Sequence, residues 1–202
     1  MAVHDGAITH QLHGQTIASL GGGVIAQKAA RLLRAGDVVL IDGGTTTCHL
    51  CFCLPPLPLR IITNSLRVAA YLDNASARRP DLEVFLSGGR IDMGSKMLSG
   101  SGTVHTLDFY HANWAFLSVG GITAGSLYNT SEPVVGTERK MIERSGRAVV
   151  LADQSRLGTR SMCRVCGVSE IDHVITDPHS GRRNLAEEAI REAGCEILYA
   201  EV

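Results

Sequence analysis

The stretch Val38-Val39-Leu40-Ile41-Asp42-Gly43-Gly44-Thr45-Thr46-Thr47 predicts a buried strand, a glycine turn and the start of a helix. The first N–H groups of a helix have no acceptor within it, and the helix dipole favours an anion at that end. Glycines let the backbone approach a ligand and can adopt positive φ. We expect the three threonine hydroxyls to face the same point as these N–H groups. The stretch therefore indicates a phosphate site, with a tight turn capped by threonine as the structural alternative.

The spacing of these glycines excludes two common nucleotide motifs. It matches neither the Gly-x-Gly-x-x-Gly pattern of dinucleotide-binding proteins nor the Gly-x4-Gly-Lys-Ser/Thr pattern of P-loop proteins. We therefore expect neither NAD nor ATP, and no other cofactor.

The composition indicates an α/β protein without a strong charge preference. The chain has 202 residues, of which 45% are hydrophobic and only 4% aromatic, and it contains 22 glycines. This suits one sizeable core, or a main domain with a small appendage, built from aliphatic side chains around glycine turns. The net charge of -1 offers no broad attraction to DNA or to an acidic membrane. A role with nucleic acid would need a local patch or a further segment.

The cysteines and the N-terminus indicate a reducing compartment. No apolar run reaches the roughly 18–20 residues that span a bilayer, and no signal peptide is evident, so we expect a cytoplasmic protein. The cysteines are then reduced thiols. The pairs Cys48-x2-Cys51 and Cys163-x2-Cys166 have the spacing of zinc half-sites, but apolar neighbours of the first pair favour buried thiols, and we expect no metal. The six cysteines are Cys48, Cys51, Cys53, Cys163, Cys166 and Cys195.

Apolar periodicity divides the chain into an N-terminal segment and one domain. Residues 1–21 carry scattered histidines and glycines without a sustained apolar period, so we expect a mobile arm, an exchanged segment or a linker. Residues 22–202 form the domain. Its first helix is predicted over 25–33 and ends at Ala35-Gly36-Asp37.

Short apolar strands alternate with helices in this domain. Such alternation requires crossover connections, so it predicts an α/β fold with a mostly parallel open sheet and helices on both faces. In this architecture ligands bind outside the carboxyl ends of the strands. The strands are predicted at 38–41, 60–63, 82–86, 114–119, 148–152, 173–175 and 196–199, and helices from Thr45 onward and over 66–72, 132–145 and 185–193.

Glycine, hydroxyl and charged residues follow these strands, so they can converge on one crevice. Each group also has a structural interpretation, as a helix cap, a simple turn, a loop ion pair or a solvated charge. Glu138 lies on the helix before the fifth strand and either faces the crevice or is an exposed helix glutamate. The candidate binding residues are Asp42, Gly43, Gly44, Thr45, Thr46, Thr47, Asn64, Ser65, Gly88, Gly89, Arg90, Gly120, Gly121, Glu138, Asp153, Ser155 and Arg156.

An ordered set of motifs resembles the sensor domain of DeoR-type transcriptional regulators over residues 22–202. The resemblance implies the fold of the ribose-5-phosphate isomerase, CoA transferase and initiation-factor-2B group. It implies no catalytic residue, but a domain that binds a phosphorylated sugar or related metabolite and forms dimers or tetramers. Occupancy then controls DNA binding by an N-terminal winged helix-turn-helix, as in a repressor. The motifs are Asp42-Gly-Gly-Thr-Thr-Thr47, Thr63-Asn-Ser65, Ser87-Gly-Gly-Arg90, Ala115-Phe-Leu-Ser-Val-Gly-Gly-Ile122, Lys140-Met-Ile142, Leu151-Ala-Asp-Gln-Ser-Arg156 and Val174-Ile-Thr-Asp177.

By this resemblance, Gly43 to Thr47 and Arg156 hold the phosphate, and the groups at 64–65 and 88–90 line the sugar. Three departures from the family pattern stand out. Arg156 replaces the usual lysine, so a planar guanidinium group takes the place of a compact ammonium group. Asn113 replaces an aspartate, and no helix-turn-helix pattern precedes residue 22.

The alternative function is that of a phosphosugar isomerase. Thr137-Glu138-Arg139-Lys140 is similar to the segment of ribose-5-phosphate isomerases in which a glutamate at the place of Glu138 acts as the base. The acidic segment of those enzymes corresponds here to Ser118-Val-Gly-Gly-Ile122, which has no carboxylate. We therefore expect a sensor that does not turn over its ligand.

Overall fold

The centre of the protein is a seven-stranded sheet in which every neighbouring pair of strands is parallel. The computed structural model describes residues 2–4, 7–12, 15–19, 22–75, 78–178 and 185–200. The order across the sheet is β15-β14-β12-β9-β4-β5-β6, which confirms the predicted α/β fold class. The bounds are β4 (Val38–Ile41), β5 (Leu59–Thr63), β6 (Leu82–Leu86), β9 (Ala112–Leu117), β12 (Ser145–Leu151), β14 (His173–Thr176) and β15 (Glu196–Tyr199).

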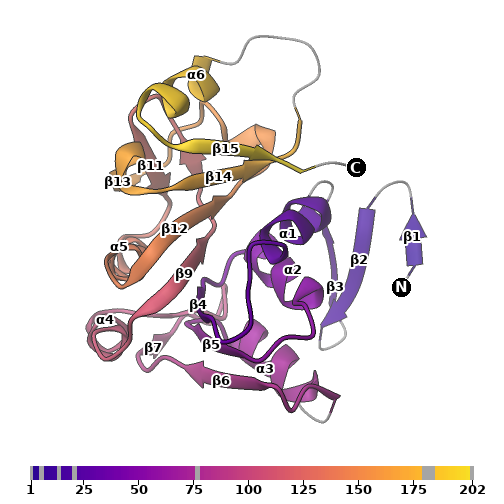
Figure 1. Cartoon of the computed structure of the whole chain (residues 1–202). Helices are drawn as coiled ribbons and strands as arrows, with labels where there is room; N and C mark the ends of the chain where they lie inside the picture. The colour runs from indigo at the N-terminus through magenta and orange to yellow at the C-terminus, as the bar shows by residue number, and fades with distance from the viewer. Residues whose placement is uncertain are drawn as a thin grey trace.

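Helices cover both faces of the sheet, as Figure 1 shows. Val39 and Ile41 of β4 pack into the same core cluster as α1, α2 and α3, whereas Leu40 faces α4 and α5, and α6 packs on this second side. Alternate side chains of a strand point to opposite faces, which is why the apolar run 38–41 is buried on both. The helices are α1 (Gly22–Ala30), α2 (Thr45–Cys53), α3 (Leu66–Ala75), α4 (Ser101–Leu107), α5 (Glu132–Glu143) and α6 (Leu185–Glu192).

The order of the strands creates a switch point between β4 and β9. From β4 the chain moves outward through β5 to β6, and then returns to the other side of β4 as β9. In parallel sheets the carboxyl ends of two strands at such a switch point are where ligands commonly bind. The structure thus has the geometry for a site at the edge where the sequence predicts one.

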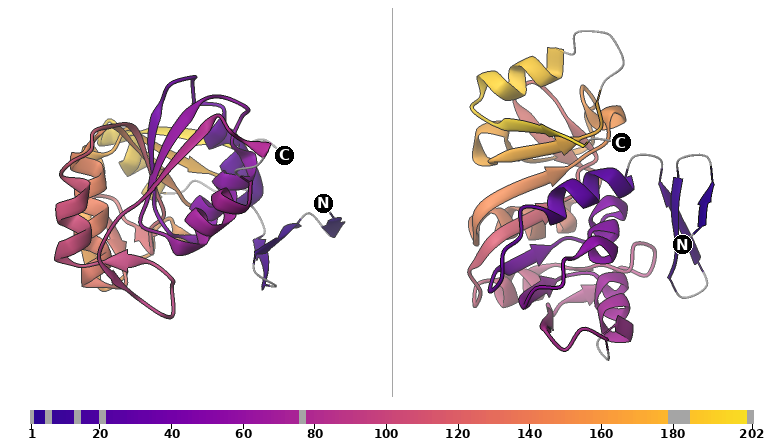
Figure 2. Two further views of the ribbon diagram at one scale, coloured as in Figure 1. Left: turned by 90° about the horizontal axis from the view of Figure 1, so that it is seen from below. Right: turned by 45° about the vertical axis from the view of Figure 1, so that its right-hand side comes forward.

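Short strands outside the main sheet were not evident from the sequence. Two of these groups lie in the connections that cross the carboxyl edge, and a third, at the N-terminus, stands beside α2 (Figure 2). The groups are β1 (Ala2–His4), β2 (Ala7–Leu12) and β3 (Gln15–Ser19); β7 (Arg90–Ile91) and β8 (Leu98–Ser99); and β10 (Gly121–Ile122), β11 (Ser126–Asn129) and β13 (Cys163–Gly167).

Part of the predicted N-terminal arm, residues 1–21, lies outside the described residues, and its role as an arm or linker stays a prediction. Several helix ends differ from expectation, and the helix predicted over 66–72 runs on to Ala75. The first helix ends at Ala30 and a turn carries the chain on to Gly36, whose φ is +87°. The helix predicted through Ser145 ends at Glu143, because Ser145 already pairs with Ala112 of β9. Among the described residues, no helix is long and apolar enough to cross a membrane.

Phe116 tests the position of the core. Its side chain on β9 is fully buried, so Phe116→Ala should lower the free energy of unfolding by about 3–5 kcal/mol through lost burial and a cavity. Urea denaturation followed by circular dichroism measures this change. Phe109→Ala is the control, because Phe109 is 76% exposed and its loss should cost less than about 0.5 kcal/mol. Equal losses in the two variants would contradict this core.

Candidate functional site at the switch point

Asp42 joins the carboxyl ends of β4 and β9. It directly follows β4, and only 1% of the residue is exposed. Its Oδ2 accepts hydrogen bonds from the Ser118 hydroxyl at 2.9 Å and from the Ser118 N–H at 3.4 Å. Burial raises the pKa of Asp42, while hydrogen bonds from Gly43 and Ser118 oppose the shift. The site is therefore built around a carboxyl group held between the two central strands.

Gly43 and Gly44 are required by close packing. A Cβ on Gly44 would lie 1.8 Å from Oγ of Ser118, and one on Gly43 would lie 2.5 Å from Cγ of Met97. The expectation of positive φ does not hold at either glycine, and φ of Gly44 is −70°. The turn therefore needs glycines because the loop after β9 and the segment before β8 come so near to it.

The three threonines that begin α2 differ in their surroundings. Thr45 is exposed, whereas Thr46 is 9% exposed and Thr47 is fully buried. The Thr47 hydroxyl donates to the Gly44 carbonyl at 2.9 Å, so the expectation that all three hydroxyls face one point is wrong for Thr47. The N–H groups of a first helical turn have no acceptor inside the helix, and an anion-binding role for this turn stays a prediction.

Glu138 places a second buried carboxyl group beside the first. It lies on α5 and is 1% exposed, so the alternative of an exposed helix glutamate is wrong. Nδ2 of Asn129, the last residue of β11, donates to Oε1 of Glu138 at 2.5 Å. Burial raises the pKa of Glu138 well above its usual value, and the charge of Asp42 raises it further. The two carboxyl groups are thus close enough to interact.

One oxygen of each carboxyl group in this pair lacks a hydrogen-bond partner within the described residues. Among the described residues, Oδ1 of Asp42 and Oε2 of Glu138 are buried and have no hydrogen-bond partner. A buried acceptor without a partner is costly, and hydroxyl groups of a polyol can supply the missing donors. The arrangement is therefore suited to a ligand with several hydroxyls, since a hydroxyl can both donate to and accept from a carboxyl group.

Asn64 and Ser65 follow β5 and are fully buried. Oγ of Ser65 accepts a hydrogen bond from the Val68 N–H at 3.3 Å, so Ser65 caps α3 as its structural interpretation predicts. Nδ2 of Asn64 donates to the Leu98 carbonyl at 3.3 Å, and the Leu98 N–H donates to the Asn64 carbonyl at 2.7 Å. Asn64 therefore ties the β7–β8 ribbon to the end of β5, next to Asp42.

Gly88, Gly89 and Arg90 lead from β6 into the β7–β8 ribbon. The Thr103 hydroxyl of α4 donates to the Gly88 carbonyl at 2.6 Å. Gly89 has a φ of +123°, which favours glycine, and a Cβ there would lie 2.0 Å from Oγ1 of Thr103. Arg90 is exposed and lies opposite Ser99 in the ribbon. The two glycines thus let the ribbon pack closely against α4. A ligand contact by Arg90 stays a prediction.

Asp153, Ser155 and Arg156 follow β12, the neighbour of β9. The Asp153 carboxylate accepts hydrogen bonds from the Ser155 N–H at 3.0 Å and from the Ser155 hydroxyl. These bonds cap a short 3-10 helix (Gln154–Arg156), as the structural interpretation of this cluster predicts. Arg156 is exposed, and no hydrogen bond or ion pair joins its guanidinium to the rest of the described chain. Arg156 is therefore the member of this cluster that can reach a ligand.

Gly120 and Gly121 allow the loop that carries Arg156 to pack closely against them. A Cβ on Gly120 would lie 2.5 Å from Oγ of Ser161, and one on Gly121 would lie 2.2 Å from the Thr159 carbonyl oxygen. The Gly158 N–H also donates to the Ile122 carbonyl at 2.7 Å. The two glycines therefore hold the loop after β12 against the end of β9.

Two residues of the site were missed from the sequence. Ser118 could have been predicted, because it is the polar residue that directly follows the apolar run of β9. Asp42 was chosen because it follows β4 in the same way. Asn129 gave no such signal, because β11 is a short ribbon strand outside the main sheet. Its contact with Glu138 depends on how that ribbon crosses α5.

The cysteines lie away from any arrangement suited to a metal. Cys48 and Cys51 are buried on α2, and burial raises the pKa of both thiols, that of Cys48 to about 11. Cys163 and Cys166 lie on the short strand β13. In the part of the chain that the structure describes, no group of three or more His, Cys, Asp or Glu side chains could hold a metal ion.

A comparison with protein families identifies the family to which this chain is similar. Residues 23–178 match the family described as the DeoR C terminal sensor domain. The match includes each strand-end motif from Asp42 to Asp177. The chain belongs to this family.

Relatives of this DeoR sensor domain are transcriptional regulators. The HTH-type transcriptional repressor GlcR of Bacillus subtilis (strain 168) is 32% identical over 153 residues, which cover 76% of this chain and 58% of GlcR. The HTH-type transcriptional regulator UlaR of Escherichia coli (strain SMS-3-5 / SECEC) is 34% identical over 174 residues, which cover 86% of this chain and 66% of UlaR. The chain therefore spans less than two thirds of the length of these relatives.

Solved structures confirm the fold group. The probable sor operon regulator from Shigella flexneri has a TM-score of 0.52 at 12% identity, covering 84% of this chain and 87% of that chain. The eIF2B beta structure from Chaetomium thermophilum has a TM-score of 0.54 at 12% identity, covering 86% of this chain and 53% of that chain. At this identity the likeness concerns the fold alone.

Gly44→Ala tests the close approach of the loop after β9. The new Cβ would overlap Ser118, whose hydroxyl is held by Asp42, so the variant should lose about 1–3 kcal/mol of unfolding free energy in urea denaturation. Gly136→Ala is the matched control, because a Cβ there meets nothing within 4 Å and the residue lies inside α5. That variant should gain about 0.5–1 kcal/mol. A Gly44→Ala protein as stable as the wild type would contradict the close packing of Gly44 against Ser118.

Glu138→Gln tests the buried carboxyl pair through pH. Because the pKa of Glu138 is raised in the folded state, that state holds a proton which the unfolded chain releases. Stability should therefore fall as pH rises from about 4.5, the ordinary pKa of a glutamate, into the neutral range, and the fall should be smaller in Glu138→Gln, with Asp42 contributing the remainder. Melting temperatures across this range measure the slope. Glu143→Gln, an exposed glutamate of the same helix, should leave it unchanged. A wild-type slope of opposite sign would contradict the buried pair.

Proposed function

We propose that this chain is the effector-binding and oligomerisation part of a cytoplasmic DeoR-family transcriptional repressor, and that its effector is a phosphorylated sugar or related metabolite. The buried pair Asp42 and Glu138 beside the start of α2 is the observation that carries the proposal. It supplies acceptors for sugar hydroxyls next to a helix N-terminus that favours a phosphate. The family match and the regulator relatives support the assignment.

Within this proposal the two ends of the effector are bound by different chemistry. The N–H groups of residues 43–47 and the Arg156 guanidinium hold the phosphate, since Arg156 is exposed on a loop seated against β9. Asp42, Glu138 and Asn64 accept or donate hydrogen bonds to hydroxyls of the sugar. Ser65 and Asp153 mainly maintain helix caps, so their effect on binding is indirect.

Regulation requires that the effector bind one arrangement of subunits more tightly than another. A ligand with equal affinity for both arrangements shifts nothing, however tightly it binds. We propose that the sensor forms a homo-oligomer and that effector binding changes the spacing of winged helix-turn-helix modules carried by the full-length regulator.

The competing function is sugar-phosphate isomerisation with Glu138 as the base. The raised pKa and buried position of Glu138 suit proton transfer, but the loop after β9 carries Ser118 where the isomerases carry carboxylates. The relatives are transcriptional regulators. We therefore propose that the domain binds without turnover.

Thermal shift with a panel of phosphorylated sugars tests effector binding. At a concentration of about one hundred times Kd, a ligand of the native state adds about 2.7 kcal/mol, which raises Tm by roughly 5–10 °C in a domain of this size. We expect such a rise for at least one phosphosugar and a much smaller one for the same sugar without phosphate. No rise with any phosphosugar would refute the sensor proposal.

Two arginines of one loop provide the matched comparison. Arg156→Ala should reduce the thermal shift, whereas Arg160→Ala, which removes an exposed arginine that lies over the Tyr128 ring, should retain it. Incubation of the binding phosphosugar with the wild-type protein, followed by chromatography of the sugars, separates sensing from catalysis. Formation of an isomer that Glu138→Gln abolishes would establish the isomerase instead.

A further inference from the structure

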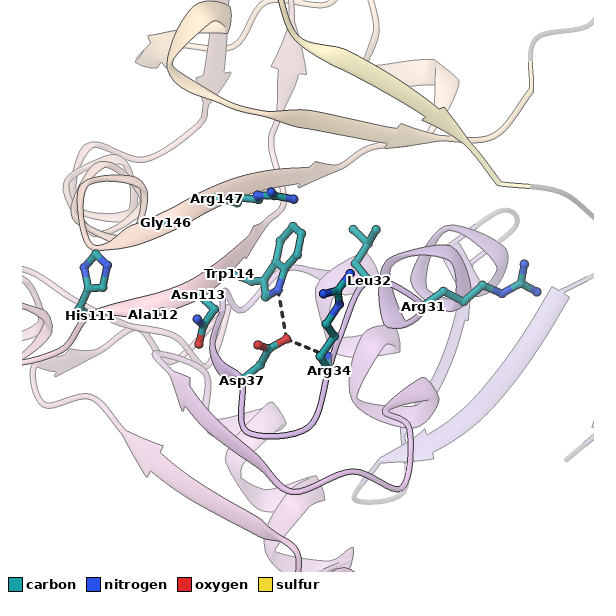
Figure 3. Close-up of a pocket in the computed structure, with 10 residues that line it drawn as sticks. All are labelled: Arg31, Leu32, Arg34, Asp37, His111, Ala112, Asn113, Trp114, Gly146 and Arg147. Carbon is teal, nitrogen blue, oxygen red and sulfur yellow. Dashed lines mark hydrogen bonds between the residues drawn. The ribbon is translucent and has the colours of Figure 1, made fainter.

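The amino ends of the strands carry a pocket that the proposed effector site does not use. It has a volume of about 520 Å³ and lies between the end of α1 and the starts of β9 and β12. Pockets of about 300–1,000 Å³ commonly hold small molecules. The residues that line it are Arg31, Leu32, Arg34, Asp37, His111, Ala112, Asn113, Trp114, Gly146 and Arg147 (Figure 3).

Trp114 and Arg147 form one wall of this pocket. They are directly opposite each other in the pairing of β9 with β12, and the Arg147 guanidinium carbon lies 5.2 Å from the centre of the indole ring. This distance is that of a cation–π contact. The indole N–H donates to Oδ2 of Asp37 at 3.2 Å, which fixes the ring from the other side. The wall is therefore ordered by contacts within the protein.

The polar groups of the pocket are predominantly donors. Asp37 is the one carboxylate in the lining, and its Oδ2 already accepts hydrogen bonds from the Trp114 side chain and from the Arg34 N–H, the latter at 2.8 Å. The side-chain oxygen Oδ1 of Asn113 accepts a hydrogen bond from the Val38 N–H at 2.8 Å. The NH₂ group of the same side-chain amide is left as a donor.

Three guanidinium groups lie around this pocket without carboxylate partners. Among the described residues, no ion pair engages Arg31, Arg34 or Arg147. Figure 3 shows Arg34 and Arg147 flanking Trp114, with Arg31 extending away from the ring. A bound anion would supply these guanidinium groups with a partner of opposite charge. Guanidinium forks also match the geometry of phosphate and carboxylate groups.

From this geometry we infer a second ligand site, at the amino edge of the sheet, for a small organic anion that bears a phosphate or several carboxylates. Arg34, Arg147 and the Asn113 amide bind the charged groups, and Trp114 with Leu32 contacts the body of the molecule. The inference is independent of the effector site, because the two sites lie at opposite ends of the strands and share no residue.

The fluorescence of Trp114 tests this site directly, because the chain contains one tryptophan. The probes are inorganic pyrophosphate, ribose 5-phosphate and citrate, titrated into the full chain at about 0.15 M salt, where weak surface attraction is screened. We expect a saturable fluorescence change with at least one probe, and calorimetry should give the same Kd. Pyrophosphate and citrate distinguish a phosphate from a carboxylate preference.

Variants decide where the probe binds. The double variant Arg34→Ala/Arg147→Ala should bind at least about tenfold more weakly by calorimetry, since each lost charged hydrogen bond weakens binding substantially. Arg78→Ala removes one exposed arginine outside the pocket and should bind as the wild type does. Failure of all three probes to bind would overturn the inference. Binding that survives the double variant but is lost in Arg156→Ala would overturn it too, because the anion would then occupy the carboxyl edge.

Discussion

The rest of the structure depends on the hydrogen bonds between Asp42 and Ser118. They join the ends of β4 and β9, the two strands between which the chain reverses its direction across the sheet. The close approach that they require explains the glycine at position 44, since a side chain there would overlap Ser118. It also buries a carboxyl group and raises its pKa, so the junction is held at a cost in electrostatic energy.

A second buried carboxyl group increases that cost. Glu138 has one hydrogen bond, from Asn129, and its pKa is raised both by burial and by Asp42. Replacement of buried charged groups by apolar residues of similar size is often neutral or stabilising, because apolar groups need neither solvation nor partners. We propose that ligand binding accounts for the carboxyl groups buried at this switch point, and the membership of a sensor family agrees with that proposal.

The main sheet was predictable because several of its strands contain short apolar runs, such as 39–41 and 61–62, that are buried and bounded by glycines, caps or charges. The ribbons around it were not. β7 and β8 have two residues each, β11 has four, and such segments lack a periodicity that can be read. The candidate site shows the same division. Asp42 follows from its place after a strand, whereas the contact of Glu138 with Asn129 depends on a ribbon that folds over α5. A pattern along the chain predicts which residues reach the edge of the sheet, but their partners there come from non-local packing.

The two edges of the sheet carry different sets of polar groups, which the net charge of -1 conceals. The buried carboxyl groups of Asp42 and Glu138 lie at the carboxyl edge. The pocket at the amino edge is lined by Arg31, Arg34 and Arg147, for which no ion pair is found among the described residues. A chain-wide charge therefore limits only non-specific attraction to a polyanion such as DNA, and has no bearing on recognition by a single pocket. The backbone dipoles of a sheet do not explain this polarity, because they alternate and leave a small net moment. Side chains such as those of Asp42 and Arg147 set it, so the two ends of the same strands can select different ligands.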